Sequence, residues 1–328
     1  MKVLVTGGVG YIGTHVVNEL LRERYSVVVA DNFASGGPGN IHYNVGLEKV
    51  DLADEYETLN LFQRHQFDAV IHLAGSINVA ESIVSPEVYY RNNVTVTQNL
   101  LNAMRGRVNN LVFASTSAVY GEGGLKGDFI EDHPTEPKNP YGQTKLVCEK
   151  MIEAWGKAHD INYVVLRYFN VAGADHRICE NLSYNHLIPA TILVAEKVTD
   201  ELVVNGYDYE TPDGTCIRDY VDVRDVARAN TAALRHLING GENLTLNVGS
   251  GIATSVLDVV KMVKDVTGKP ICVKYKGRRE GDIVCTVAVT TAIRNKLGWV
   301  PEFSDLKTIV ADTYIAMAYN RAFGNRVG

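Results

Sequence analysis

The chain has 328 residues, 46% of them hydrophobic and 21% charged, which is the composition of an ordinary globular protein. Its net charge of -6 argues against a general nucleic-acid binder or a protein held on anionic membranes. The five cysteines form no C-x-x-C pair, so we expect reduced, buried thiols, and the nine histidines show no metal-binding spacing. The first apolar run is too short for a signal peptide, and no stretch is long enough to cross a membrane. We therefore expect a cytoplasmic protein.

The first half of the chain alternates short apolar runs with amphipathic segments. This rhythm predicts a doubly wound, parallel α/β sheet of the Rossmann type with right-handed crossovers. The expected strands are Lys2–Thr6, Ser26–Asp31, Ala69–Leu73, Asn110–Ser115 and Tyr163–Phe169, and the expected helices are Ile12–Glu23, Tyr56–Arg64, Pro86–Met104 and Tyr141–Ala158.

After Asn170 the alternation breaks, which predicts a smaller, interleaved α/β lobe. A helix at Asp222–Leu237 and a strand at Thr245–Val248 are expected to return to the sheet. We predict a dinucleotide-binding domain of residues 1–170 plus about 218–250, and a substrate-binding domain of residues 171–217 plus 251–328. The remaining expected elements are helix Leu187–Lys197, strand Leu202–Asn205, helix Leu257–Val266, strand Ile271–Tyr275, and helices Thr291–Leu297 and Leu306–Phe323.

A glycine-rich run follows the first strand and opens the first helix: Gly7, Gly8, Val9, Gly10, Tyr11, Ile12, Gly13. Glycines let the backbone turn sharply and approach a pyrophosphate, whose charge is stabilised at a helix N-terminus. Asp31 ends the second strand, where a carboxylate can bind both ribose hydroxyls and would repel a 2′-phosphate. The pattern predicts NAD as cofactor; the alternative is a tight structural turn.

Two further segments fit the same cleft. Asp51 and Leu52 follow a third short strand and could flank an adenine, although a plain surface aspartate is an equal alternative. Leu73, Ala74 and Gly75 end another strand, and their small residues would let the backbone approach the cofactor.

Tyr141 and Lys145 lie four residues apart at the start of a helix and therefore share one face. A tyrosine phenol titrates near pH ~10, and a nearby cation would lower that pKa enough for a general base. Thr116 ends a strand at the carboxyl edge of the sheet, where ligands bind, and could complete a proton relay. A surface Tyr–Lys pair and a strand-end turn are the alternatives.

Nine segments resemble UDP-glucose 4-epimerases of the extended short-chain dehydrogenase/reductase superfamily over nearly the whole chain. They are VTGGVGYIGTHVV, VIHLAGSINVAES, YYRNNV, FASTSAVYG, NPYGQTKLVCE, LRYFNVAGA, HLIP, DGTCIRDYVDV and RREGD. The resemblance implies 4-epimerisation of UDP-hexoses through a 4-keto sugar with bound NAD. It also implies a homodimer formed by the helices at Pro86–Met104 and Tyr141–Ala158.

The resemblance also implies roles for individual residues. Thr116, Tyr141 and Lys145 would be catalytic. The NAD site would include Gly7, Gly10, Tyr11, Ile12, Gly13, Asp31, Asn32, Phe33, Ser35, Gly36, Asp51, Leu52, Leu73, Ala74, Gly75, Asn93 and Phe169. The UDP-sugar would contact Thr116, Asn170, His186, Leu187, Val203, Arg218, Arg279, Asp282 and Thr286.

Several positions depart from the family pattern. Ile77 replaces a lysine, His186 an asparagine and Val289 an aspartate. Thr286 replaces a tyrosine that excludes N-acetyl groups, which predicts activity on UDP-N-acetylglucosamine as well, although Thr286 could instead be a core strand residue.

Two alternatives to a 4-epimerase remain open. One is another sugar-nucleotide enzyme: a 4,6-dehydratase, a decarboxylase or a UDP-glucuronate epimerase. A dehydratase needs an additional acid beside the tyrosine, and Ala118 occupies the place where that family has an acidic residue. The other is a non-catalytic NAD-sensing module, which would be expected to lack Tyr141 or Lys145.

Overall fold

The computed structural model describes residues 1–34, 36–37, 41–42, 44–122, 128–175, 184–279 and 282–323. Its centre is a seven-stranded sheet in the order β3-β2-β1-β4-β5-β7-β12, with every neighbouring pair parallel. The order reverses between β1 and β4, which is where open α/β sheets bind ligands. The strands are β1 (Lys2–Thr6), β2 (Ser26–Asp31), β3 (Gly46–Lys49), β4 (Ala69–His72), β5 (Asn110–Thr116), β7 (Asn162–Tyr168) and β12 (Leu244–Val248). The predicted fold class and the return of β12 to the sheet are confirmed.

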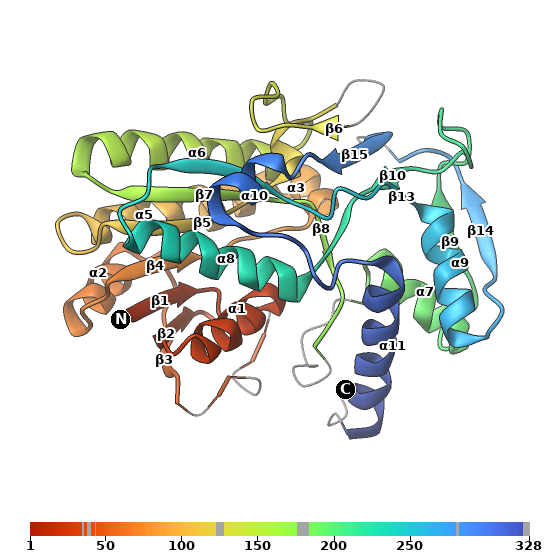
Figure 1. Cartoon of the computed structure of the whole chain (residues 1–328), viewed down its shortest axis with the longest axis horizontal. Helices are drawn as coiled ribbons and strands as arrows, with labels where there is room; N and C mark the ends of the chain where they lie inside the picture. Colours follow the sequence, from red (N-terminus) through yellow and green to blue (C-terminus); the bar gives the residue numbers. More distant parts are fainter. Residues whose placement is uncertain are drawn as a thin grey trace.

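Helices cover both faces of this sheet (Figure 1). Along β5, Val112 and Ala114 pack into the core beneath α1 and α8, whereas Leu111 and Phe113 pack into the core beneath α2, α5 and α6. Burial on both faces explains why the strands are almost continuously apolar. The bounds of these helices are α1 (Tyr11–Arg22), α2 (Glu55–Arg64), α5 (Val96–Met104), α6 (Pro140–His159) and α8 (Val223–Ile238).

The single helix expected over Pro86–Met104 is wrong in detail. The segment consists of α4 (Pro86–Tyr89), a π-helical stretch η2 (Tyr90–Thr95) and α5, and a short α3 (Val79–Val84) precedes it. A π turn inserts one extra residue per turn and has no periodicity that distinguishes it from an α-helix in a sequence. Such turns are frequent at functional sites.

A second core lies at the far end of the molecule (Figure 1). It joins α7 (Leu187–Ala195), α9 (Val256–Thr267) and α11 (Leu306–Phe323) through side chains such as Ile192, Val259 and Val310.

None of the helices in the described residues is long and apolar enough to span a membrane. The remaining elements are η3 (Ser117–Val119), β6 (Asp128–Phe129), β8 (Asn170–Ala172), β9 (Leu202–Asn205), β10 (Ile217–Arg218), β11 (Tyr220–Asp222), β13 (Thr254–Ser255), β14 (Val273–Lys276), β15 (Cys285–Ala288) and α10 (Thr291–Leu297).

A buried carboxylate ties a small second sheet, of order β13-β10-β15-β6, to the end of β12. Asp219, which is fully buried, accepts hydrogen bonds from Ser250 N (2.7 Å), Gly251 N (2.9 Å) and Ala288 N (3.0 Å). Because Asp219 follows Arg218 directly, these bonds also fix the strand that carries this predicted substrate residue.

The expectation that all cysteines are buried is partly wrong. Cys148 and Cys216 are buried, but Cys272 is exposed and Cys285 is half-buried. Cys179 lies outside the described residues.

Candidate active site

A cavity of about 600 Å³ opens at the carboxyl ends of β5 and β7 and extends to the second core. Its walls come from segments far apart in the sequence, including α1, β5, α6, α7, β10, β15 and α11. Twelve predicted site residues line it: Tyr11, Ile12, Thr116, Tyr141, Phe169, Asn170, His186, Leu187, Arg218, Arg279, Asp282 and Thr286. The fold thus brings most of the predicted sugar-nucleotide residues to one place.

The glycine-rich loop between β1 and α1 has packing that only glycine permits. Gly7 has a φ of +70°, and a Cβ there would lie 2.7 Å from the backbone nitrogen of Ala74. A Cβ on Gly13 would overlap the carbonyl oxygen of Gly7. Gly10 is the N-cap of α1 and makes no side-chain cap, so the first N–H groups of the helix are available to an anion.

Asp31 ends β2 beside this loop. Its carboxylate accepts hydrogen bonds from Val9 N (3.2 Å) and Phe33 N (2.9 Å), and each oxygen keeps a second lone pair for a ribose hydroxyl. Asn32 caps the same turn by accepting a bond from Ala34 N at 3.0 Å. A Cβ on Gly36 would lie 2.8 Å from the carbonyl oxygen of Val9. These features fit the binding of a dinucleotide. The predicted residue Ser35 lies outside the described residues.

Asn93 is a buried residue that connects two segments beside the site. This side chain is only 1% exposed; its amide nitrogen donates to Thr144 Oγ1 (2.9 Å), and its oxygen accepts from Ser76 N (2.8 Å). A Cβ on Gly75 would lie 2.7 Å from that amide oxygen. Asn93 therefore joins the loop after β4 to α6. Its predicted contact with the cofactor stays a prediction.

The catalytic candidates meet where β5 ends and α6 begins. Thr116 is the last residue of β5; it lines the same cavity as Tyr141, and its hydroxyl acts to lower the pKa of the Tyr141 phenol. Asn139 caps α6 by accepting a bond from Gly142 N at 2.9 Å, which fixes the first turn that carries Tyr141. Lys145 Nζ donates to the carbonyl oxygen of Ala114 at 2.9 Å. The fold therefore brings the end of one strand beside the first turns of one helix, and the role of these three residues as a proton relay stays a prediction.

The pKa of Tyr141 differs from the sequence-based expectation of a lowered value. Burial raises the pKa of Tyr141, and the Thr116 hydroxyl acts in the opposite direction. Burial also lowers the pKa of Lys145, while Cys148 and Glu149 oppose that effect. The Lys145 ammonium is bonded to the strand carbonyl of Ala114.

The wall of the cavity formed by β10 and the start of α7 carries cationic and polar groups. Arg218 Nη1 donates to the carbonyl oxygens of Ile217 (2.9 Å) and Ile283 (2.6 Å), which holds the guanidinium against the segment that precedes β15. His186 is the N-cap residue of α7 but makes no side-chain cap, and burial lowers its pKa, so the imidazole is neutral near pH 7.

Some predicted residues lie away from the cavity. Asp51 pairs with Arg91 at 2.9 Å, and the Leu52 side chain is buried in the core beneath α2 and α5. Leu73 and Ala74 line the glycine loop rather than the cavity. Val203 lies on β9 with 37% of its surface exposed and does not line the cavity.

The cavity also has an apolar wall that the sequence patterns did not predict. Ile77, Val79, Ala80 and Ile83 line it from α3 and the residue stretch before it. Only Ile77 carried a signal, as a departure from the family's lysine. Thr313, from α11, carried no local signal because its place in the cavity depends on how α11 packs against α7 and α9.

The loop geometry predicts that Gly7→Ala abolishes copurification of NAD, because the new Cβ would collide with backbone and the positive φ would be strained. NAD released from denatured protein should be close to one equivalent for the wild type and at least about tenfold lower for the variant. Gly277→Ala is the matched control, because a Cβ there meets nothing within 4 Å. Equal NAD content in all three proteins would contradict this interpretation.

Comparisons with known proteins agree with this geometry. The family model "NAD dependent epimerase/dehydratase family" matches residues 3–249. The UDP-glucose 4-epimerase of Halalkalibacterium halodurans is 41% identical over 94% of this chain and 93% of its own length. The structure of UDP-glucose 4-epimerase from Brucella ovis in complex with NAD superposes with a TM-score of 0.91 at 39% identity, covering 98% of both chains. That of the UDP-Glc/GlcNAc 4-epimerase from Campylobacter jejuni has a TM-score of 0.85 at 35% identity, covering 97% of this chain and 99% of the other. The resemblance seen in the sequence is confirmed: the chain belongs to the NAD-dependent epimerase/dehydratase family, with UDP-glucose 4-epimerases as its relatives.

Proposed function

We propose that the protein interconverts UDP-glucose and UDP-galactose by inverting the configuration at C4 of the sugar, with NAD as its resident cofactor. The observation that carries this proposal is the placement of Thr116 and Tyr141 in the wall of one cavity that Tyr11 and Ile12 of the glycine loop also line. Bound NAD would supply the acceptor for the C4 hydride and the donor for its return, so no second redox substrate would be required.

The chain's own residues would move the proton and hold the substrate. Tyr141 takes the proton of the 4-hydroxyl, directly or through Thr116, and later returns it. Arg218 and Arg279 provide guanidinium groups suited to a diphosphate, while Asp282 can accept bonds from ribose hydroxyls.

Inversion at C4 requires that the sugar turn over while the nucleotide stays bound. The wall formed by Ile77, Val79 and Ile83 offers apolar side chains and therefore no side-chain hydrogen bonds to the hexose. A weak hold on the sugar beside a firm hold on the diphosphate favours this rotation.

The cavity lining supports an epimerase over a dehydratase. Elimination of the 6-hydroxyl needs an additional acid beside the tyrosine. Ala118 and Ser117 line the cavity next to Thr116, and the carboxylate among the described lining residues is Asp282, which adjoins the arginine-bearing segment.

Tyr141→Phe is expected to fold normally and to lose activity by roughly two to four orders of magnitude, because it removes only the ionisable hydroxyl. Turnover of UDP-galactose should be measured by NMR. Tyr163→Phe, on β7 and outside the cavity, is the control and should keep wild-type turnover. Near wild-type activity in Tyr141→Phe would refute the mechanism.

We further propose that the enzyme also acts on UDP-N-acetylglucosamine. Thr286 is 5% exposed, lines the cavity and pairs with Arg218 across β10 and β15. Threonine is much smaller than tyrosine, so it leaves room for a bulky 2-substituent on the sugar.

Thr286→Tyr should lower kcat/KM for UDP-N-acetylglucosamine relative to UDP-glucose by about tenfold or more, since the phenol would fill that room. Val284→Tyr places the same side chain two residues earlier, at a 38% exposed position outside the cavity, and should leave the ratio unchanged. An unchanged ratio in Thr286→Tyr would mean that residue 286 does not face the sugar.

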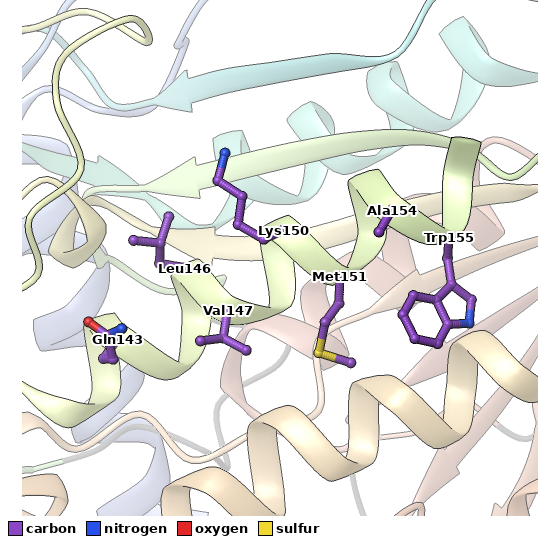
Figure 2. Close-up of a pocket in the computed structure, with 7 residues that line it drawn as sticks. All are labelled: Gln143, Leu146, Val147, Lys150, Met151, Ala154 and Trp155. Carbon is purple, nitrogen blue, oxygen red and sulfur yellow. The ribbon is translucent and has the colours of Figure 1, made fainter. Parts of the chain in front are cut away.

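We also propose a cytoplasmic homodimer with two domains divided as the sequence predicts. The dimer contact would include an apolar groove on α6, of about 400 Å³, lined by Gln143, Leu146, Val147, Lys150, Met151, Ala154 and Trp155. In Figure 2, Val147, Met151 and Trp155 project from the same side of α6. The separate core of α7, α9 and α11 supports the division into domains.

Val147→Glu is expected to convert the dimer to a monomer, because an unpaired carboxylate would be buried in the contact at a cost of about 3 kcal/mol or more. Sedimentation velocity measures the change. Lys157→Glu introduces the same side chain on α6 outside the groove, where the lysine is 75% exposed, and should remain dimeric. A dimeric Val147→Glu protein would contradict the assignment of this face.

A further inference from the structure

A buried ion pair lies behind the cavity wall, between α6 and β7. Arg167 donates to Glu149 through Nη2 at 2.7 Å and through Nε at 3.1 Å, and their side chains are 8% and 7% exposed. Glu149 Oε1 also accepts a hydrogen bond from Ser115 Oγ at 2.5 Å. Removing two charges from water is costly, so stability alone is a weak reason for such a pair.

Glu149 lies four residues after Lys145 and eight after Tyr141, on the face of α6 that meets β5. Three consecutive residues at the end of β5 therefore meet this one face, and two of them are hydrogen-bonded to it. Lys145 Nζ donates to the carbonyl oxygen of Ala114, and Ser115 Oγ donates to the Glu149 carboxylate. Thr116 shares the cavity lining with Tyr141, and its hydroxyl acts to lower the pKa of that phenol.

The Thr116–Tyr141 contact depends on how β5 and α6 are offset. Thr116 Oγ1 already accepts a bond from Ala118 N at 3.1 Å, which leaves its proton free to point toward the Tyr141 oxygen. A hydrogen bond between hydroxyls weakens steeply when its length or angle departs from the normal range. A small slip of the strand along the helix would therefore break it.

We propose that Glu149, held by Arg167, is a positioning residue that locks β5 against α6 and so keeps Thr116 within hydrogen-bond reach of Tyr141. The proposal rests on the proposed function, because the relay it positions would serve the sugar hydroxyl. Arg167 is itself fixed: Nη1 donates to the carbonyl oxygen of Glu131 at 3.1 Å, and the guanidinium lies 4.8 Å from the ring centre of Tyr120.

The charge of Glu149 has a second effect on the same helix. It opposes the burial that lowers the pKa of Lys145 and so favours the ammonium form. Glu149 therefore acts on Thr116 through its contact with Ser115, and on Lys145 through its charge.

The test uses a neutral pair, Glu149→Gln with Arg167→Gln, which keeps an amide hydrogen bond and leaves no single buried charge. We expect wild-type NAD content and KM for UDP-glucose, with kcat lowered about ten- to a hundredfold by misalignment. The pKa of Tyr141 should rise, because the Thr116 hydroxyl that lowers it moves away. Ultraviolet absorption of tyrosinate, measured against the same protein carrying Tyr141→Phe, reports this titration without substrate.

Glu153→Gln is the matched control, one turn later on α6, where Glu153 is 40% exposed and pairs with Lys157. It should change neither kcat nor the titration. A folded neutral pair with wild-type kcat and wild-type Tyr141 titration would overturn the proposal.

If the neutral pair does not fold, Ser115→Ala decides, because it removes one hydroxyl and no charge. A raised Tyr141 pKa in this variant supports the positioning role of Glu149, and an unchanged pKa refutes it. A wild-type protein without epimerase activity would refute the proposed function instead, and the titration would still decide the positioning role.

Discussion

The contact between the end of β5 and the first turns of α6 is the one on which the candidate site depends. It is made by a strand carbonyl, a serine hydroxyl and a threonine hydroxyl on one side, and by Lys145, Glu149 and Tyr141 on the other. The rest of the fold holds these two elements in place. The flanking strands β4 and β7 fix β5, and Asn93 ties α6 to the loop after β4.

Burial sets the chemistry of this contact. Burial in a low-dielectric environment disfavours ionisation of the Tyr141 phenol and so raises its pKa. Within the chain, the Thr116 hydroxyl acts in the opposite direction and lowers that pKa. The positive charge of bound, oxidised NAD is a contribution that the chain does not supply itself. Proton transfer and hydride transfer would therefore be coupled, because the phenolate is favoured when the cofactor is ready to accept hydride.

Much of this arrangement was predictable from local patterns. A few adjacent residues encode strand β1 (Lys2–Thr6), the glycine loop, and the spacing of Tyr141 and Lys145. The π turn around Asn93 was not predictable, because its side-chain spacing overlaps that of an α-helix. Nor was the pairing of Ile217–Arg218 with Cys285–Thr286, since two-residue strands carry almost no periodic signal. The partners Glu149 and Arg167 are 18 positions apart and meet only once α6 packs on β7.

Inversion at C4 of the sugar should use a hydride that never leaves the enzyme. UDP-glucose carrying deuterium at C4 tests it most directly, with products read by NMR and mass spectrometry in ordinary water. We expect UDP-galactose that retains the deuterium at C4, formed without added cofactor. Loss of the deuterium to solvent, or recovery of the label only in unchanged UDP-glucose, would contradict the account.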